Sequence, residues 1–251
     1  MEPADRPISR RGRFAVIVPS TNTVVEHDYN LLAPEGVTLH AGRMYIESPA
    51  MGSNDDFMAL IGQIRESIRI AVRDVLTCEP DRMVMGMSAE TFWGGVEGNR
   101  AFVERIREQA GGLEVSTGAS ACREALEALG ARRIAAFSPY QPVADEQVGT
   151  YFAEAGFEVA RVTGLRCPTA TAIAEVDEAT LVRTVMDLDG DDVDAIVQVG
   201  TNLPFVRTAA ACERVLGKPV IAINTATLWH ALRHHGIDDR SDAFGSLLRD
   251  H

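Results

Sequence analysis

The chain has 251 residues, of which 46% are hydrophobic and 24% charged, a composition that suits one large or two small globular domains. Its formal net charge of -12 repels phosphate backbones and anionic lipids, so we expect neither nucleic acid nor a membrane as a partner. No apolar run approaches the roughly 18 residues that span a bilayer. The four cysteines are scattered singly, which favours a reducing, cytoplasmic location over a disulfide scaffold or a structural zinc site.

Short apolar runs alternate with longer amphipathic stretches in the first half of the chain. Residues 1–13 are polar and rich in arginine, and we expect them to form a mobile arm. Beyond them the pattern predicts strands at 14–18, 37–40, 83–85 and 113–115. It predicts helices at 57–76, 102–109 and 119–129, the last followed by Gly130 as helix C-termini often are.

The second half continues the same alternation. The pattern predicts strands at 134–137, 157–162, 195–199 and 220–223. It predicts helices at 143–155, 178–188, 205–216 and 226–235. Alternating strands and helices indicate an α/β fold whose parallel sheets have helices on both faces.

The two halves of the chain contain similar segments in the same order. The pairs are 14–20 with 134–140, 85–88 with 199–202, and 125–130 with 231–236. We therefore expect two duplicated Rossmann-like (flavodoxin-like) parallel-sheet lobes related by a pseudo-twofold axis, residues 14–115 plus 221–251 forming one and 116–220 the other. The strand-end loops of both lobes then face one cleft, where ligands of open α/β sheets bind.

Hydroxyl and amide side chains follow the first strand at 19–23. With the free N–H groups of a helix start, Asn22 and its neighbours offer a seat for a carboxylate. The same residue types are equally typical of a helix N-cap, and the sequence leaves both interpretations open.

Further candidate residues lie in the loops after later strands. Ser88 offers a hydroxyl donor, and Glu90 lies beside Phe92 and Trp93, which can raise its pKa toward the working pH and make it a general acid or base. The alternative for Glu90 is a carboxylate favoured by a helix dipole. The second half also places hydrogen-bond donors after its strands: Tyr140, Thr201, Asn202 and Asn224.

No cofactor site is indicated. The chain lacks a GxGxxG motif and a P-loop, so we expect no dinucleotide or nucleoside triphosphate. The neighbouring His234 and His235 near a helix end are more typical of an interaction with the helix dipole, and we assign no metal ligands.

These loops resemble those of maleate cis-trans isomerases and arylmalonate decarboxylases, two groups of the Asp/Glu racemase superfamily. The segments that carry the resemblance are 19–26, 86–88, 138–140, 200–203 and 217–232. The resemblance covers nearly the whole chain from Phe14. It implies a cofactor-independent isomerase or decarboxylase-type lyase that acts on a small carboxylic or dicarboxylic acid.

The resemblance breaks at the cysteines. These families place one or two cysteines across the cleft, and the matching positions here are Gly86 and Gly200. Two-thiol chemistry is therefore not expected, and the smaller glycines predict room for a substrate bulkier than maleate.

Hydrogen-bond donors remain that can stabilise an enediolate, as an oxyanion hole does: Asn22, Ser88, Tyr140, Thr201 and Asn202. The proton must then come from Glu90 or Tyr140. Two alternatives stay open: a hydrolase or hydratase with Glu90 as base, and a catalytically silent carboxylate-binding protein. We also expect the chain to form a homo-oligomer.

Overall fold

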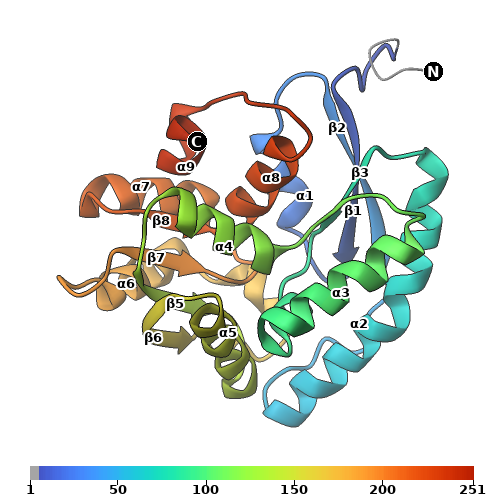
Figure 1. Cartoon of the computed structure of the whole chain (residues 1–251). Helices are drawn as coiled ribbons and strands as arrows, with labels where there is room; N and C mark the ends of the chain where they lie inside the picture. The colour runs from blue at the N-terminus through green and yellow to red at the C-terminus, as the bar shows by residue number, and fades with distance from the viewer. Residues whose placement is uncertain (1–5) are drawn as a thin grey trace.

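The computed structural model describes residues 6–251 and contains two four-stranded parallel sheets (Figure 1). The first sheet has the order β2-β1-β3-β4, with strands β1 (Gly12–Pro19), β2 (Val37–Met44), β3 (Arg82–Met85) and β4 (Val115–Ser116). The second has the equivalent order β6-β5-β7-β8, with strands β5 (Arg133–Ser138), β6 (Glu158–Gly164), β7 (Ala195–Gln198) and β8 (Val220–Ala222). The prediction of two α/β lobes of the same topology is confirmed.

One α-helix connects each pair of strands that follow one another within a sheet, as parallel pairing requires. The first lobe uses α1 (Val25–Leu32), α2 (Asn54–Val75) and α3 (Gly95–Gln109). The second uses α5 (Pro142–Glu154), α6 (Glu178–Leu188) and α7 (Val206–Leu216). The strands β3, β7 and β8 are buried along their whole length, because helices cover both faces of each sheet.

One further helix follows the last strand of each sheet, and these two helices lie against each other. The helix α4 (Gly118–Ala128) leads from β4 to the second sheet, and α8 (Ile223–Arg233) leads from β8 back to the first, where it contacts α1, β3 and β4. The short helix α9 (Ser246–Asp250) ends the chain. The exact division into lobes at residues 115 and 220 stays a prediction.

The structure differs from the predicted elements in three helices, one of which is α9, for which no helix was predicted. The helix α1 was not predicted, because it spans only eight residues and the polar run Glu26–Asp28 separates Val25 from its other apolar residues. The helix α3 begins at Gly95, seven residues before the predicted start, after Gly94 in a left-handed conformation at the N-cap. The sequence shows little helical periodicity at the start of α3, because few residues of this helix are buried.

The mobile arm at residues 1–13 stays a prediction; residues 1–5 lie outside the described residues, and residues 6–13 contact the first lobe. The Arg6 guanidinium pairs with Asp81, and Ser9 hydrogen-bonds Thr38 at 2.8 Å. Residues 12 and 13 belong to β1. Ion pairing and strand pairing thus hold this segment on the first lobe.

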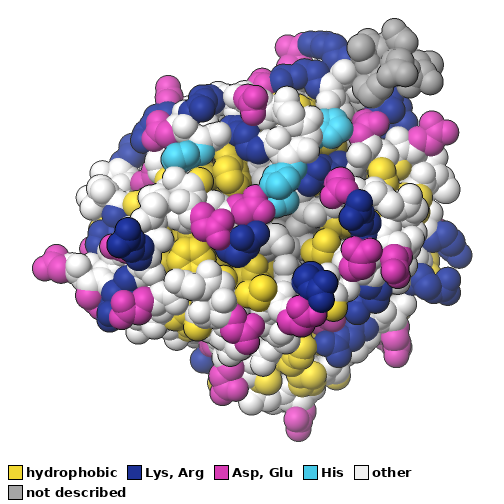
Figure 2. All heavy atoms as spheres, viewed as in Figure 1, with side chains coloured by type: hydrophobic (Ala, Val, Ile, Leu, Met, Phe, Trp, Pro, Cys, Tyr) yellow, Lys and Arg dark blue, Asp and Glu magenta, His cyan; other side chains and the backbone are white. Residues whose placement is uncertain are grey.

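On the face in Figure 2, acidic and basic side chains are interspersed, with small apolar areas between them. The net negative charge is therefore not concentrated in one patch of this face. Within residues 6–251, no helix is long and apolar enough to cross a membrane.

Candidate functional site

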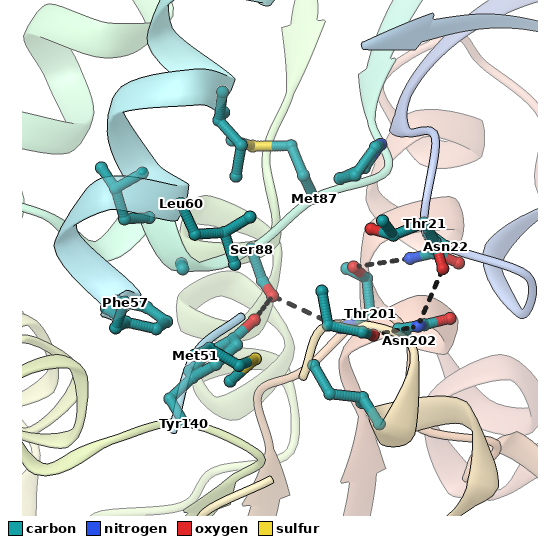
Figure 3. Close-up of a pocket in the computed structure, with 16 residues that line it drawn as sticks. Thr21, Asn22, Met51, Phe57, Leu60, Met87, Ser88, Tyr140, Thr201 and Asn202 are labelled. Atoms are coloured by element: carbon teal, nitrogen blue, oxygen red, sulfur yellow. Dashed lines mark hydrogen bonds between the residues drawn. The ribbon is translucent and has the colours of Figure 1, made fainter. Parts of the chain in front are cut away.

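A cavity lies between the lobes, at the carboxyl ends of the strands (Figure 3). Pro19 ends β1, Met87 and Ser88 follow β3, Tyr140 follows β5 and Thr201 follows β7. The cavity volume is about 60 Å³, well below the roughly 300–1,000 Å³ of sites for drug-sized ligands. In this conformation the site therefore suits a small ligand.

Hydrogen bonds connect the polar residues of the cavity across the lobe boundary. The Asn22 amide donates to Thr201 Oγ1 at 3.3 Å, and the Thr201 N–H donates to Ser88 Oγ at 3.3 Å. Ser88 Oγ lies 2.5 Å from the Tyr140 hydroxyl. Asn22 and Tyr140, predicted to share one cleft although they come from different halves, do line the same cavity.

The two hydroxyls of Ser88 and Tyr140 leave one hydrogen for a ligand. The Thr201 N–H already donates to Ser88 Oγ. Only one hydroxyl hydrogen lies between the two oxygens, so the other is free to donate into the cavity. Burial raises the pKa of Tyr140 to about 12, which keeps its phenol protonated at neutral pH.

The opposite wall of the cavity is apolar. The helix α2 supplies Phe57, Leu60, Ile61 and Ile64, which share one face because helical residues three and four apart are neighbours. Met51, Met87 and Ile173 extend this wall. No charged side chain of residues 6–251 is among those that line the cavity. A bound acid is therefore met by neutral donors on one side and by hydrocarbon on the other.

Asn22 holds the start of α1, whereas its role in binding a carboxylate stays a prediction. Its Oδ1 accepts hydrogen bonds from the N–H groups of Val24 and Val25 at the start of α1, and its Nδ2 faces the cavity residue Thr201. Asn202 also lines the cavity and fixes the lobes to each other: its Oδ1 accepts from Thr23 N–H at 3.0 Å, and its Nδ2 donates to Ala170 O at 2.9 Å.

Two predicted site residues do not line the cavity. Glu90 is buried with Oε1 2.8 Å from Arg65 Nε, and a second arginine, Arg105, lies 3.9 Å away. Its Oε2 is buried with no hydrogen-bond partner among the described residues. Of the two aromatic residues expected to shield the carboxylate, Phe92 packs on Tyr151 and Phe152.

Asn224, predicted to bind substrate, lies behind the cavity. Its Nδ2 donates to Thr201 O at 3.0 Å and to Asp28 Oδ2 at 2.8 Å. It therefore positions Thr201 rather than touching a ligand. Asp28 was not predicted, and its signal, one acidic residue in a polar helix, is common. It is buried, which raises its pKa to about 6 despite the hydrogen bond from Asn224.

The surroundings of the two glycines at the expected cysteine positions leave no room for a larger side chain. A Cβ at Gly86 would lie 2.9 Å from Val25 Cγ1, and one at Gly200 would overlap the ring of Pro139. Neither glycine lines the cavity, so the expectation that they enlarge it is wrong: neighbouring side chains fill that space. Thr201 Oγ1 donates to Gly86 O at 3.3 Å, so the two segments do meet between the lobes. None of the four cysteines lines the cavity.

Comparison with known proteins agrees with this geometry. Residues 14–248 match the family model of arylmalonate decarboxylase. A maleate isomerase of Pseudomonas putida is 29% identical over 94% of this chain and 96% of its own length. The arylmalonate decarboxylase of Bordetella bronchiseptica is 32% identical over 61% of this chain and 64% of its own. A solved cysteine-to-serine variant of the Nocardia farcinica maleate cis-trans isomerase, with a covalently bound succinylcysteine intermediate, has a TM-score of 0.85 at 25% identity, covering 95% of this chain and 98% of its own.

Proposed function

Because the chain belongs to the arylmalonate decarboxylase family, and thus to enzymes of the isomerase or carbon-carbon lyase type, we propose that it is a cofactor-independent decarboxylase. Its substrate in this proposal is a small 2-substituted malonate, and the reaction passes through an enediolate. The observation that carries the proposal is the division of the cavity into a cluster of neutral donors and an apolar wall. A geminal diacid presents one carboxylate to each side.

The donor side binds the carboxylate that stays. The one free hydroxyl hydrogen of the Ser88–Tyr140 pair donates to its oxygens, and the Thr201 hydroxyl can join it by turning away from Gly86 O, while the other carboxylate faces Leu60 and Ile64. An ionised carboxylate against hydrocarbon is unfavourable, and loss of neutral CO₂ relieves that cost. The carbon-carbon bond breaks, its electron pair enters the enediolate, and the donors stabilise the oxygen charge that develops.

A proton must then reach the α-carbon to give the monocarboxylic acid. We assign this step to the Tyr140 hydroxyl, which lines the cavity and whose pKa of about 12 keeps the proton available. The tyrosinate formed is reprotonated from water, so atoms and charges balance over the cycle. Glu90 can take this role only if its side chain turns away from Arg65.

Covalent addition of a cysteine to a double bond does not enter the proposal. The succinylcysteine intermediate belongs to the Nocardia farcinica enzyme. In the present chain the cavity is lined by no cysteine, and the sequence resemblance predicts that Gly86 and Gly200 take the positions of the family thiols. Isomerisation by a thiol adduct therefore has no group to perform it.

The test is CO₂ release from a series of 2-substituted malonates, from 2-methylmalonate to 2-phenylmalonate, in deuterated water. We expect turnover without added cofactor and one deuterium at the α-carbon of each product. Conversion of maleate to fumarate without CO₂ release would contradict the proposal in favour of an isomerase. Incorporation of oxygen-18 from water would indicate a hydratase or hydrolase, and binding without any turnover a silent carboxylate-binding protein.

A further inference from the structure

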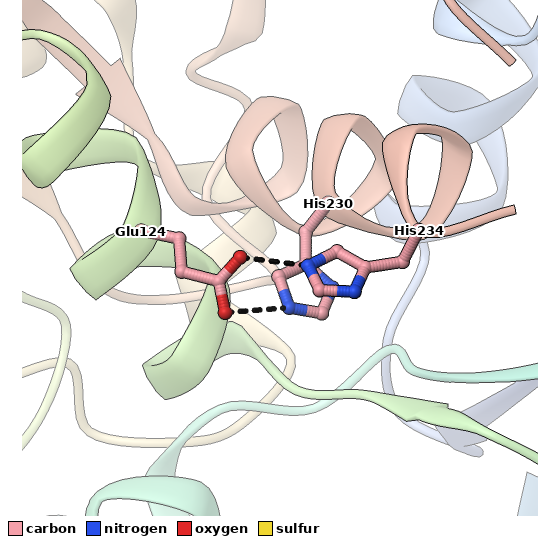
Figure 4. A group of neighbouring side chains, drawn as sticks. All are labelled: Glu124, His230 and His234. Carbon is pink, nitrogen blue, oxygen red and sulfur yellow. Dashed lines mark hydrogen bonds and ion pairs between the residues drawn. The ribbon is translucent and has the colours of Figure 1, made fainter. Parts of the chain in front are cut away.

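A second cluster of chemically active side chains lies outside the cavity, where α4 packs against α8 (Figure 4). Glu124 of α4 faces His230 of α8 and His234, the residue that caps the C-terminus of α8. Its Oε1 lies 3.3 Å from His230 Nε2, and its Oε2 lies 2.7 Å from His234 Nε2. None of the three residues lines the cavity, so the cluster is separate from the candidate active site.

We propose that Glu124, His230 and His234 bind a divalent metal ion of the zinc class. Two imidazoles and one carboxylate are a common ligand set for zinc, and histidines four residues apart share one face of a helix. The three donor atoms lie within 4.8 Å of one another. A tetrahedral ion with bonds of about 2.1 Å needs donors about 3.4 Å apart, so small side-chain rotations suffice.

The surroundings of His230 favour the arrangement a metal requires. His230 Nε2 faces Glu124, and Ser116 Oγ lies 2.9 Å from Nδ1, where it can accept the N–H once a bound ion takes the place of the proton on Nε2. The two imidazole rings stack with centroids 4.1 Å apart and planes 19° apart, so both present the same edge to the carboxylate. The tautomer and the ring orientation are thus both supported by neighbours.

Burial lowers the pKa of His230 although the neighbouring Glu124 carboxylate raises it. For Glu124, burial raises the pKa, but the hydrogen bonds from His230 and His234 outweigh it and hold the carboxyl below its ordinary pKa. Arg123 lies 3.2 Å from Glu124 Oε1 and leaves Oε2 as the carboxylate oxygen for the ion.

One side of the cluster is open to solvent. The His234 side chain is 46% exposed, whereas that of His230 is only 6% exposed. An ion can therefore enter from the His234 side and keep a water molecule as its fourth ligand. Since α4 leads into the second sheet and α8 returns to the first, the bound ion would tie together the two helices that cross between the lobes.

The experiment titrates ZnCl₂ into chelator-treated, full-length protein by calorimetry at fixed pH. We expect one site per chain, and at least about tenfold weaker binding in His234→Ala, since even outer-shell changes cost 10- to 100-fold. His27→Ala is the matched control, because this exposed histidine on α1 lies outside the cluster. Zinc should raise the melting temperature of the wild type and of His27→Ala but not of His234→Ala, since it binds the folded state.

Cobalt substitution identifies the ligands without any activity measurement. Co²⁺ in the wild type should give the visible bands of a four-coordinate nitrogen and oxygen site with no thiolate charge-transfer band. Glu124→Gln should weaken those bands. Equal zinc affinity in the wild type and His234→Ala, a thiolate band, or no zinc-dependent rise in melting temperature would each overturn the proposal.

Discussion

The two lobes share one strand order, yet their second connecting helices differ in length and in use. The helix α2 of the first lobe has 22 residues and supplies four apolar side chains to the cavity. Its counterpart α6 in the second lobe has 11 residues and supplies none. A duplicated scaffold thus brings similar donor loops together from both sides, while an asymmetric helix makes only one wall apolar. This asymmetry is what allows two carboxylates of one substrate to be treated differently.

The largest effect is expected for Tyr140, the residue that the second lobe contributes to proton transfer. Tyr140→Phe removes the proposed proton donor and should lower kcat roughly 100-fold or more, the usual scale for lost general acid catalysis. Steady-state rates of CO₂ release measure it. Tyr45→Phe is the control, since this tyrosine is 70% exposed and should leave kcat unchanged. A loss of less than about threefold in Tyr140→Phe would remove Tyr140 from the mechanism.

Each lobe has a buried carboxylate near the site, and the two carboxylates have different partners. Asp28 on α1 has an amide partner, Asn224, whereas Asp145 on α5 pairs with Arg166 at 2.5 Å. Burial raises the pKa of Asp28 to about 6, above the roughly 3.9 of an unfolded chain. Asp28 therefore stays protonated to a higher pH in the folded state than in the unfolded chain. Its contribution makes the free energy of unfolding fall as the pH rises from about 4 to about 6.

The substitution Asp28→Asn should remove that fall, which amounts to about 2–3 kcal/mol by linkage. Denaturant unfolding at pH 4 and pH 8 measures it: the variant should match the wild type at pH 4 and exceed it at pH 8. Asp145→Asn should instead destabilise the protein at pH 8, because it leaves Arg166 without its ionic partner. The same pH dependence in wild type and Asp28→Asn would show that Asp28 titrates normally.

The third largest effect is expected for substitutions in the apolar wall of the cavity, which the first lobe supplies. Leu60→Asn places an amide beside the carboxylate that must leave, which stabilises the ionised ground state. We expect kcat to fall about tenfold, equivalent to about 1.4 kcal/mol. Leu60→Met keeps the wall apolar and should stay within about threefold of the wild type, since such swaps conserve volume. Equal rates in the two variants, with melting temperatures confirming the fold, would contradict the role of the wall.

The smallest effect is expected at Glu90. This carboxylate lies in the first lobe's loop after β3 but pairs with Arg65 instead of lining the cavity. Glu90→Gln should therefore change kcat by less than about threefold, whereas general acid–base loss would cost about 100-fold. A 100-fold fall with the melting temperature unchanged would restore Glu90 as the proton-transfer group.

The sequence by itself determined the order of strands and helices and the duplication of the lobes, because both are written in local patterns. Apolar runs and helical spacing predicted all eight strands and seven of the nine α-helices in residues 6–251. The repeated strand ends then located Asn22, Ser88, Tyr140, Thr201 and Asn202 at one cavity, since parallel strands present their carboxyl ends together.

Only the tertiary structure decided what these residues face. The apolar stripe of α2 is typical of any core-facing helix, and nothing in its spacing shows that four of its side chains form a cavity wall. Likewise, Glu90 meets Arg65 across 25 positions of sequence, and Glu124 meets His230 across 106. Such pairings depend on how distant helices cross, and a local pattern of residues carries no information about its distant partner.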